Sequence, residues 1–133
     1  MSEARFLLDT QVFLWMAVSP SRLSPKTRAV LQAGDTTLLL SVASSWEIAI
    51  KYALGRLPLP TAPAQYVPER VTRDRLTPLL IQNQHALRVA ELPAHHGDPF
   101  DRLLIAQAQI ERLPIITADR QLEAYDVELM WAD

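Results

Sequence analysis

Residues 36–54 read Thr-Thr-Leu-Leu-Leu-Ser-Val-Ala-Ser-Ser-Trp-Glu-Ile-Ala-Ile-Lys-Tyr-Ala-Leu, and Gly55 follows them. The apolar run at 36–40 predicts a short buried strand. Apolar residues at positions 42, 46, 49, 50 and 53 then recur close to a helical period, which predicts a helix over 42–54 that ends at the glycine. A buried strand that leads directly into a helix is the repeating unit of a parallel α/β sheet.

The same alternation of short strands and helices continues on both sides of this unit. Ser24 and Pro25 have the character of an N-cap and a first helical residue, with Gly34 as the stop after that helix. Further strands are expected at 5–8, 78–81 and 114–117, with an edge strand near 128–131; further helices are expected at 12–18, 25–33, 64–73, 83–92 and 99–112, with a short one after Asp119. The pattern predicts an α/β protein with a mostly parallel sheet of about five strands between helices, as a single domain over residues 1–133.

Composition narrows the class of protein without fixing its function. The chain has 133 residues, of which 49% are hydrophobic and 21% charged, as in an ordinary globular domain. It has no cysteine, which excludes a disulfide framework, a zinc–thiolate site and a cysteine nucleophile. No apolar run approaches the roughly 20 residues of a membrane span, and 12–18 follows acidic residues rather than a basic leader. We therefore expect a cytoplasmic protein that does not bind membranes.

The net charge is −2, which by itself argues weakly against nucleic-acid binding. Bound cations would offset the negative charge of an acidic metal site, so the formal charge understates the attraction for phosphate. The proline-rich segment 57–63 is the best candidate for a flexible or substrate-facing loop.

Five acids are expected at one edge of the predicted sheet. Asp9 follows the first strand, Asp119 lies two residues beyond the fourth, and Glu47 is in the early turns of the helix after the second. Asp98 and Asp101 begin the helix that returns the chain to the fourth strand. Because ligand sites of open α/β sheets lie at the carboxyl ends of the strands, these side chains are expected to converge.

Each acid also has an ordinary structural explanation. Asp9, Asp98 and Asp119 are placed to cap helices, with Asp101 as a capping-box acid, and Glu47 has Lys51 four residues on. Taken together these explanations are less convincing. Glu47 lies in line with apolar residues at 43, 50 and 54, and an acid next to the core needs a partner or a metal.

Converging carboxylates repel one another unless a cation lies between them. Mg²⁺ and Mn²⁺ prefer oxygen ligands and keep several waters, one of which can serve as a nucleophile. Two such ions can stabilise the attacking and leaving oxygens of a phosphodiester displacement. The acids thus indicate metal-assisted phosphoryl chemistry.

Four segments resemble a known family when they are taken in order. They are Leu7-Leu8-Asp9-Thr10, residues 44–51 (Ser-Ser-Trp-Glu-Ile-Ala-Ile-Lys), residues 96–108 (His-Gly-Asp-Pro-Phe-Asp-Arg-Leu-Leu-Ile-Ala-Gln-Ala) and Ile116-Thr117-Ala118-Asp119. The third is highly specific, and together they resemble the PIN-domain family, in particular VapC-type toxins of type II toxin–antitoxin systems. The resemblance implies a three-layer α/β/α fold and an endoribonuclease that depends on Mg²⁺ or Mn²⁺. It also implies a homodimer, a cognate antitoxin protein and an RNA substrate such as a tRNA or rRNA loop.

The resemblance also assigns residues. It makes Asp9, Glu47, Asp101 and Asp119 the catalytic, metal-binding acids, and Leu122 departs from an aromatic residue that the family often has there. Accessory roles are expected for four more residues: Asp98 as N-cap or outer acid, Thr117 in positioning Asp119 or a metal-bound water, and Arg102 and Arg120 either at the scissile phosphate or on a solvent-facing helix.

Other side chains have structural explanations. His95 and His96 are best explained as neutral loop residues, although RNA contact or proton donation stays open. The three tryptophans, Trp15, Trp46 and Trp131, are interpreted as core or interface residues.

Two rival functions remain. Another Mg²⁺-dependent α/β phosphohydrolase is disfavoured, because a dehalogenase-like phosphatase needs a second acid two residues after the first, where this chain has Gln11, and there is no glycine-rich phosphate loop. The other rival is a catalytically inactive PIN-fold binding module, and the presence of all four acids argues against it.

Overall fold

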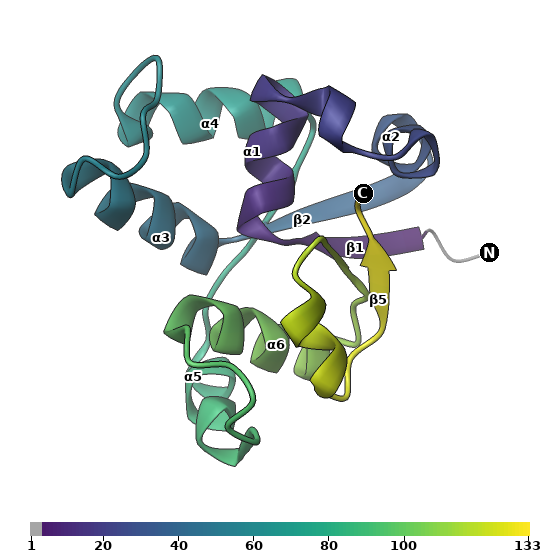
Figure 1. The fold of residues 1–133 in the computed structure, drawn as a ribbon, viewed down its shortest axis with the longest axis vertical. Helices are drawn as coiled ribbons and strands as arrows, with labels where there is room; N and C mark the ends of the chain where they lie inside the picture. Colours follow the sequence, from purple (N-terminus) through teal and green to yellow (C-terminus); the bar gives the residue numbers. More distant parts are fainter. Residues whose placement is uncertain (1–3) are drawn as a thin grey trace.

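Five strands form one sheet in the computed structural model, which describes residues 4–133 (Figure 1). They lie in the order β3–β2–β1–β4–β5, and all four neighbouring pairs are parallel. The strands are β1 (Ala4–Leu8), β2 (Thr36–Ser41), β3 (Thr77–Leu79), β4 (Ile115–Thr117) and β5 (Leu129–Trp131). The expected mostly parallel sheet of about five strands is confirmed.

Helices cover both faces of this sheet. The helices α1, α2 and α4 lie on one side, and α5 and α6 lie on the other (Figure 1). The α-helices are α1 (Thr10–Val18), α2 (Pro25–Gln32), α3 (Val42–Ala53), α4 (Pro63–Arg73), α5 (Asn83–Arg88) and α6 (Pro99–Glu111), and the 3₁₀ helices are η1 (Pro20–Arg22), η2 (Val89–Glu91) and η3 (Arg120–Ala124). The protein is thus a three-layer α/β/α structure.

The core is divided by the sheet, as alternation along the strands requires. Leu7 packs with residues of α6, whereas its neighbour Leu8 packs with residues of α1 and α4. The same alternation holds in β4, where Ile115 and Ile116 belong to opposite clusters. Leu122, which stands where the family often has an aromatic residue, is buried among residues of α6, so it contributes to the packing of the core.

Several predicted boundaries differ from the structure. The helix expected at 83–92 stops at Arg88 and continues as η2, and the strand expected at 78–81 is the shorter β3. Ser24 caps α2 as predicted, since its side chain accepts from the Thr27 amide, but that helix ends at Gln32 and Gly34 does not adopt positive φ. Gly55 does adopt a φ of 71°, so the stop after α3 is confirmed.

Within residues 4–133, no helix combines the length and the apolar character needed to cross a membrane.

Candidate metal and nucleic-acid site

The carboxyl ends of the central strands open into a pocket of about 530 Å³. The segments after β1 and β4, the first half of α1, the middle and second half of α3, and the start of α6 contribute to its wall. The five predicted acids all line this one pocket: Asp9, Glu47, Asp98, Asp101 and Asp119. The structure thus brings together acids that are up to 110 residues apart in the sequence, as the strand-end rule predicts.

Asp9 is held by the neighbouring strand rather than used as a helix cap. It precedes α1, but its side chain makes no capping hydrogen bond. The Thr117 hydroxyl donates to Asp9 Oδ2 over 2.7 Å, and Thr117 Oγ1 accepts from the Asp119 amide over 3.0 Å. Thr117 therefore positions two acids at once, whereas the sequence led us to expect that it positions Asp119 or a metal-bound water.

Glu47 is almost completely buried, with 6% of its surface exposed. Lys51 donates to Oε2 over 2.5 Å, which confirms the helix-spaced pair, but Oε1 has no hydrogen-bond partner among the described residues. The predicted apolar line around it is only partly right, because Ala43 is buried whereas Leu54 is 61% exposed. A buried carboxylate oxygen without a partner is costly, and a cation in the pocket would satisfy it.

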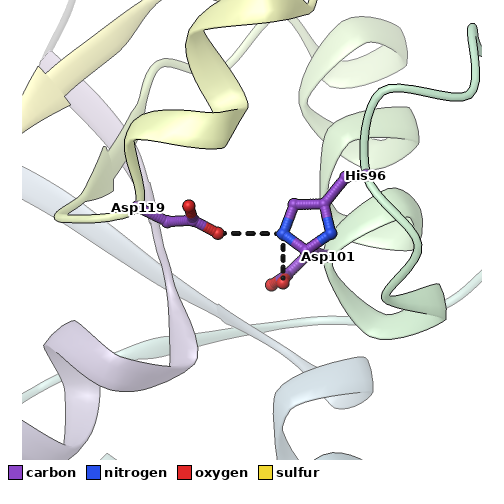
Figure 2. Close-up of side chains that lie close together, drawn as sticks. All are labelled: His96, Asp101 and Asp119. Atoms are coloured by element: carbon purple, nitrogen blue, oxygen red, sulfur yellow. Dashed lines mark hydrogen bonds and ion pairs between the residues drawn. The ribbon is translucent and has the colours of Figure 1, made fainter.

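His96 lies between two of the acids (Figure 2). Its Nε2 is 2.9 Å from Asp119 Oδ2 and 3.1 Å from Asp101 Oδ2. Its Nδ1 accepts the Asp98 amide over 3.1 Å, so in the neutral ring the proton is on Nε2 and points at the carboxylates. His96 thus lies in a loop, as expected, but its ring belongs to the acidic site. The sequence signal was its position two residues before Asp98.

His95 does not share this position. Its exposed ring packs edge-on against Tyr125, with the ring centroids 5.2 Å apart. The loop interpretation holds for this histidine.

Of the remaining three acids, Asp98 and Asp119 each cap a helix, whereas Asp101 does not. Asp98 Oδ1 accepts from the amides of Phe100 and Asp101, so its predicted role as N-cap is confirmed. Asp119 caps η3 through Oδ1 and presents Oδ2 to His96. The Asp101 side chain is directed to His96 rather than back to its own helix, so the capping-box explanation is not supported.

Burial and mutual repulsion raise the pKa of two acids in the pocket. Burial, with the charge of Asp9 and then of Asp98, raises the pKa of Asp101 to about 7. Burial also raises the pKa of Asp9, against the hydrogen bond from Thr117 that lowers it. Carboxyl groups with such pKa values are poised for a cation, which would replace their protons and remove the repulsion.

Two predicted phosphate contacts are not in the pocket. Arg102 donates to the carbonyls of Pro93, Val89 and Leu92 and to the Tyr125 hydroxyl, so it holds the loop before α6 in place. Arg120 lies 4.0 Å from the centroid of the Trp131 ring and pairs with Asp133 over 2.9 Å. Both arginines follow a site acid in the sequence, but their guanidiniums bind other partners. Arg102 binds backbone carbonyls, and Arg120 binds the carboxylate of Asp133.

The tryptophans differ from one another. Trp46 is 56% exposed and packs edge-on against Phe100, so the core interpretation is wrong for it. Trp15 is partly buried, packs against the α1 cluster and also lines the acidic pocket. Trp131 is the partly buried ring beneath Arg120.

The donor set suits a hard divalent cation. Carboxylate oxygens are the ligands that Mg²⁺ and Mn²⁺ prefer, and His96, Asp101 and Asp119 present one donor atom each within 4.8 Å of one another. The unpartnered Oε1 of Glu47 is the independent sign that these acids are arranged for a ligand.

Comparisons with known proteins agree with this geometry. The family model of the PIN domain matches residues 6–128. Ribonuclease VapC16 of Mycobacterium tuberculosis (strain ATCC 25618 / H37Rv) is 48% identical over 60 residues, which is 45% of this chain and 43% of that relative. The match therefore spans less than half the length of the relative.

Two solved structures share the fold. One is VapBC2 from Rickettsia felis bound to a DNA fragment from their promoter, with a TM-score of 0.70 and 15% identity over 97% of this chain and 99% of that chain. The other is FitAcB from Neisseria gonorrhoeae, with a TM-score of 0.57 and 22% identity over 95% of this chain and 96% of that chain. At these identities the likeness concerns the fold alone.

Proposed function

The chain belongs to the PIN domain family, and from this membership we propose that it is a metal-dependent endoribonuclease that acts as the toxin of a toxin–antitoxin pair. One observation carries the proposal: five carboxylates line a single pocket, in which buried Glu47 has an oxygen with no hydrogen-bond partner among residues 4–133. The partial match to Ribonuclease VapC16 supports the same reaction class.

In this proposal Asp9, Glu47, Asp101 and Asp119 hold Mg²⁺ or Mn²⁺. When bound, the cation supplies an activated water and charge stabilisation at the phosphodiester. Thr117 keeps Asp9 and Asp119 aligned through its hydroxyl, and Lys51 fixes one oxygen of Glu47 so that the other is free to bind. Asp98 serves as a cap and outer acid that fixes the start of α6 and thereby the position of Asp101.

The partners follow from the same proposal. We expect an RNA substrate, with a tRNA or rRNA loop as the target, and a cytoplasmic homodimer made of single-domain chains. We also expect a cognate antitoxin that blocks the acidic pocket with a basic side chain. The similarity of the fold to the structures of VapBC2 and FitAcB supports a partner of this kind.

The direct test is cleavage of a mixed RNA pool in Mg²⁺ or Mn²⁺. EDTA should abolish cleavage, and Asp101→Asn should lower the rate by at least about 10-fold, since it removes a ligand. Asp35→Asn is a matched control, because Asp35 is an exposed acid outside the pocket, and this variant should cleave like the wild type.

The alternative function, an inactive binding module, predicts a different result. A folded protein that binds its antitoxin but cleaves no RNA in any metal would support that module and contradict the nuclease. Cleavage that persists in EDTA would contradict the metal mechanism alone.

A further inference from the structure

The acidic pocket has a second, cationic part. Besides the five acids, Arg22, Lys51 and Arg56 line it, together with Trp15 and Leu57. Lys51 is already bonded to Glu47. Within residues 4–133, neither Arg22 nor Arg56 forms a salt bridge, although five carboxylates line the same pocket. These two guanidiniums are free to bind an anion from outside the chain.

The two arginines lie away from the acids along the helices that form the walls. From α1, Gln11, Leu14 and Trp15 line the pocket at helical spacing, and Arg22 follows that helix in η1. At a rise of 1.5 Å per residue, Trp15 lies roughly 9 Å along the helix direction from Asp9.

The wall that α3 forms has the same order of charges, with the acid first and the arginine beyond the end of the helix. Glu47 and Lys51 of α3 line the pocket, and Arg56 follows the helix, at the start of the proline-rich loop. The pocket therefore changes from carboxylates at the strand ends to guanidiniums beyond the helices. Leu57, in the loop that we expected to be flexible or substrate-facing, lines the same wall.

An aromatic ring lies beside one of the free cations. The Arg22 guanidinium is 5.4 Å from the centroid of the partly buried Trp15 ring. Aromatic rings and arginine planes are the surfaces on which unpaired bases stack, and guanidinium matches phosphate oxygens in a bidentate way. An acidic peptide would use the cations but would gain nothing specific from the ring.

We infer that Arg22 and Arg56 bind the phosphodiesters next to the one that is cut, and that Trp15 stacks against an unpaired base of a single-stranded RNA. This inference rests on the proposed ribonuclease function and adds the path of the strand. The free cations also offset the repulsion that five carboxylates exert on a polyanion.

Salt dependence of RNA binding tests the inference. A fluorescein-labelled single-stranded RNA pool is titrated in the Asp119→Asn background, which removes cleavage, at several salt concentrations. The logarithm of affinity falls with the logarithm of salt by about 0.7 per phosphate contact on a single strand. Arg22→Gln and Arg56→Gln should each lower that slope by about 0.7, and the double variant by about twice as much.

The controls use residues outside the pocket and a second substrate form. Arg73 of α4 is exposed, has no salt bridge among the described residues and does not line the pocket, so Arg73→Gln should leave the slope unchanged. Trp15→Leu should weaken binding of single-stranded RNA severalfold and leave binding of duplex RNA unchanged. Melting temperatures show that each variant is folded.

The outcomes distinguish a failure of the inference from a failure of the proposed ribonuclease function. An unchanged slope in the double variant, in a protein whose wild type cleaves RNA, overturns the inference and leaves the ribonuclease intact. If the wild type neither binds nor cleaves RNA, the result contradicts both the inference and the proposed ribonuclease function. Arginine-dependent binding of polyglutamate in preference to RNA would assign the cations to a protein partner and overturn the inference.

Discussion

The imidazole of His96 lies between two acids because the loop that carries it is fixed from several sides. Its amide donates to the Tyr125 hydroxyl over 2.8 Å, and its Nδ1 accepts from Asp98. With both bonds in place, the Nε2 proton can only point at Asp101 and Asp119. This side chain therefore offsets part of the repulsion between them when no metal is bound.

We expect His96→Leu to destabilise the metal-free protein by about 1–3 kcal/mol, the range for leaving buried polar groups without partners. Much of that loss should disappear when Mn²⁺ is added, because the cation takes over the neutralisation. Urea denaturation with and without Mn²⁺ measures both values. His95→Leu is the control and should show no dependence on metal. An equal loss in both conditions would give His96 a packing role only.

At the scale of elements, Arg102 shows how α6 and the preceding loop form one unit. Its guanidinium lies on the first turns of α6 and donates to three carbonyls between Val89 and Pro93. Two of those carbonyls, of Leu92 and Pro93, follow η2, and the third, of Val89, also accepts the Leu92 amide within η2. The loop that presents His96 thus depends on a helix residue for which we had expected either a phosphate contact or a solvent-facing position.

Arg102→Met keeps most of the side-chain length and removes every donor. We expect a loss of roughly 1.5–3 kcal/mol in the free energy of unfolding, the range for hydrogen bonds to charged groups, together with faster amide exchange over residues 89–97. Arg73→Met is the matched control, since Arg73 is exposed and forms no salt bridge among the described residues. Unchanged exchange in Arg102→Met would show that the loop is held by other contacts.

The elements followed from local sequence better than the side-chain directions did. Strand and helix positions depend on apolar periodicity and on punctuation such as Ser24 and Gly55, which are local. The convergence of the acids was predictable because topology alone brings strand ends together. The directions of His96, Arg102 and Trp46 were harder to predict, because each depends in part on a partner distant in the sequence, Tyr125 for the first two and Phe100 for the third.

At the scale of the whole molecule, the acidic pocket makes stability depend on pH and metal. The pKa of Asp101 is about 7 in the folded chain, against an ordinary value of 3.8, and the pKa of Asp9 is also raised. The folded state therefore binds more protons than the unfolded state between these values. Its stability falls as pH rises from about 4 to about 7.

Chemical denaturation in EDTA should thus give a lower free energy of unfolding at pH 8 than at pH 5. Asp101→Asn should flatten this decline, because the amide does not ionise. Mg²⁺ or Mn²⁺ should raise stability most at the higher pH, where the carboxylates are free to bind it. Stability that rises from pH 5 to pH 8 in EDTA would contradict the raised pKa values.

The central claim is that these carboxylates form one divalent-metal site, and titration of Mn²⁺ into the metal-free protein, followed by electron paramagnetic resonance, tests it directly. We predict saturable binding by the wild type and by Asp35→Asn. Glu47→Gln, which leaves Lys51 a neutral partner and removes the charge at the unpartnered Oε1, should bind at least about 10-fold more weakly. Equal Mn²⁺ affinity in the wild type and Glu47→Gln, or no binding by the folded wild type, would contradict the account.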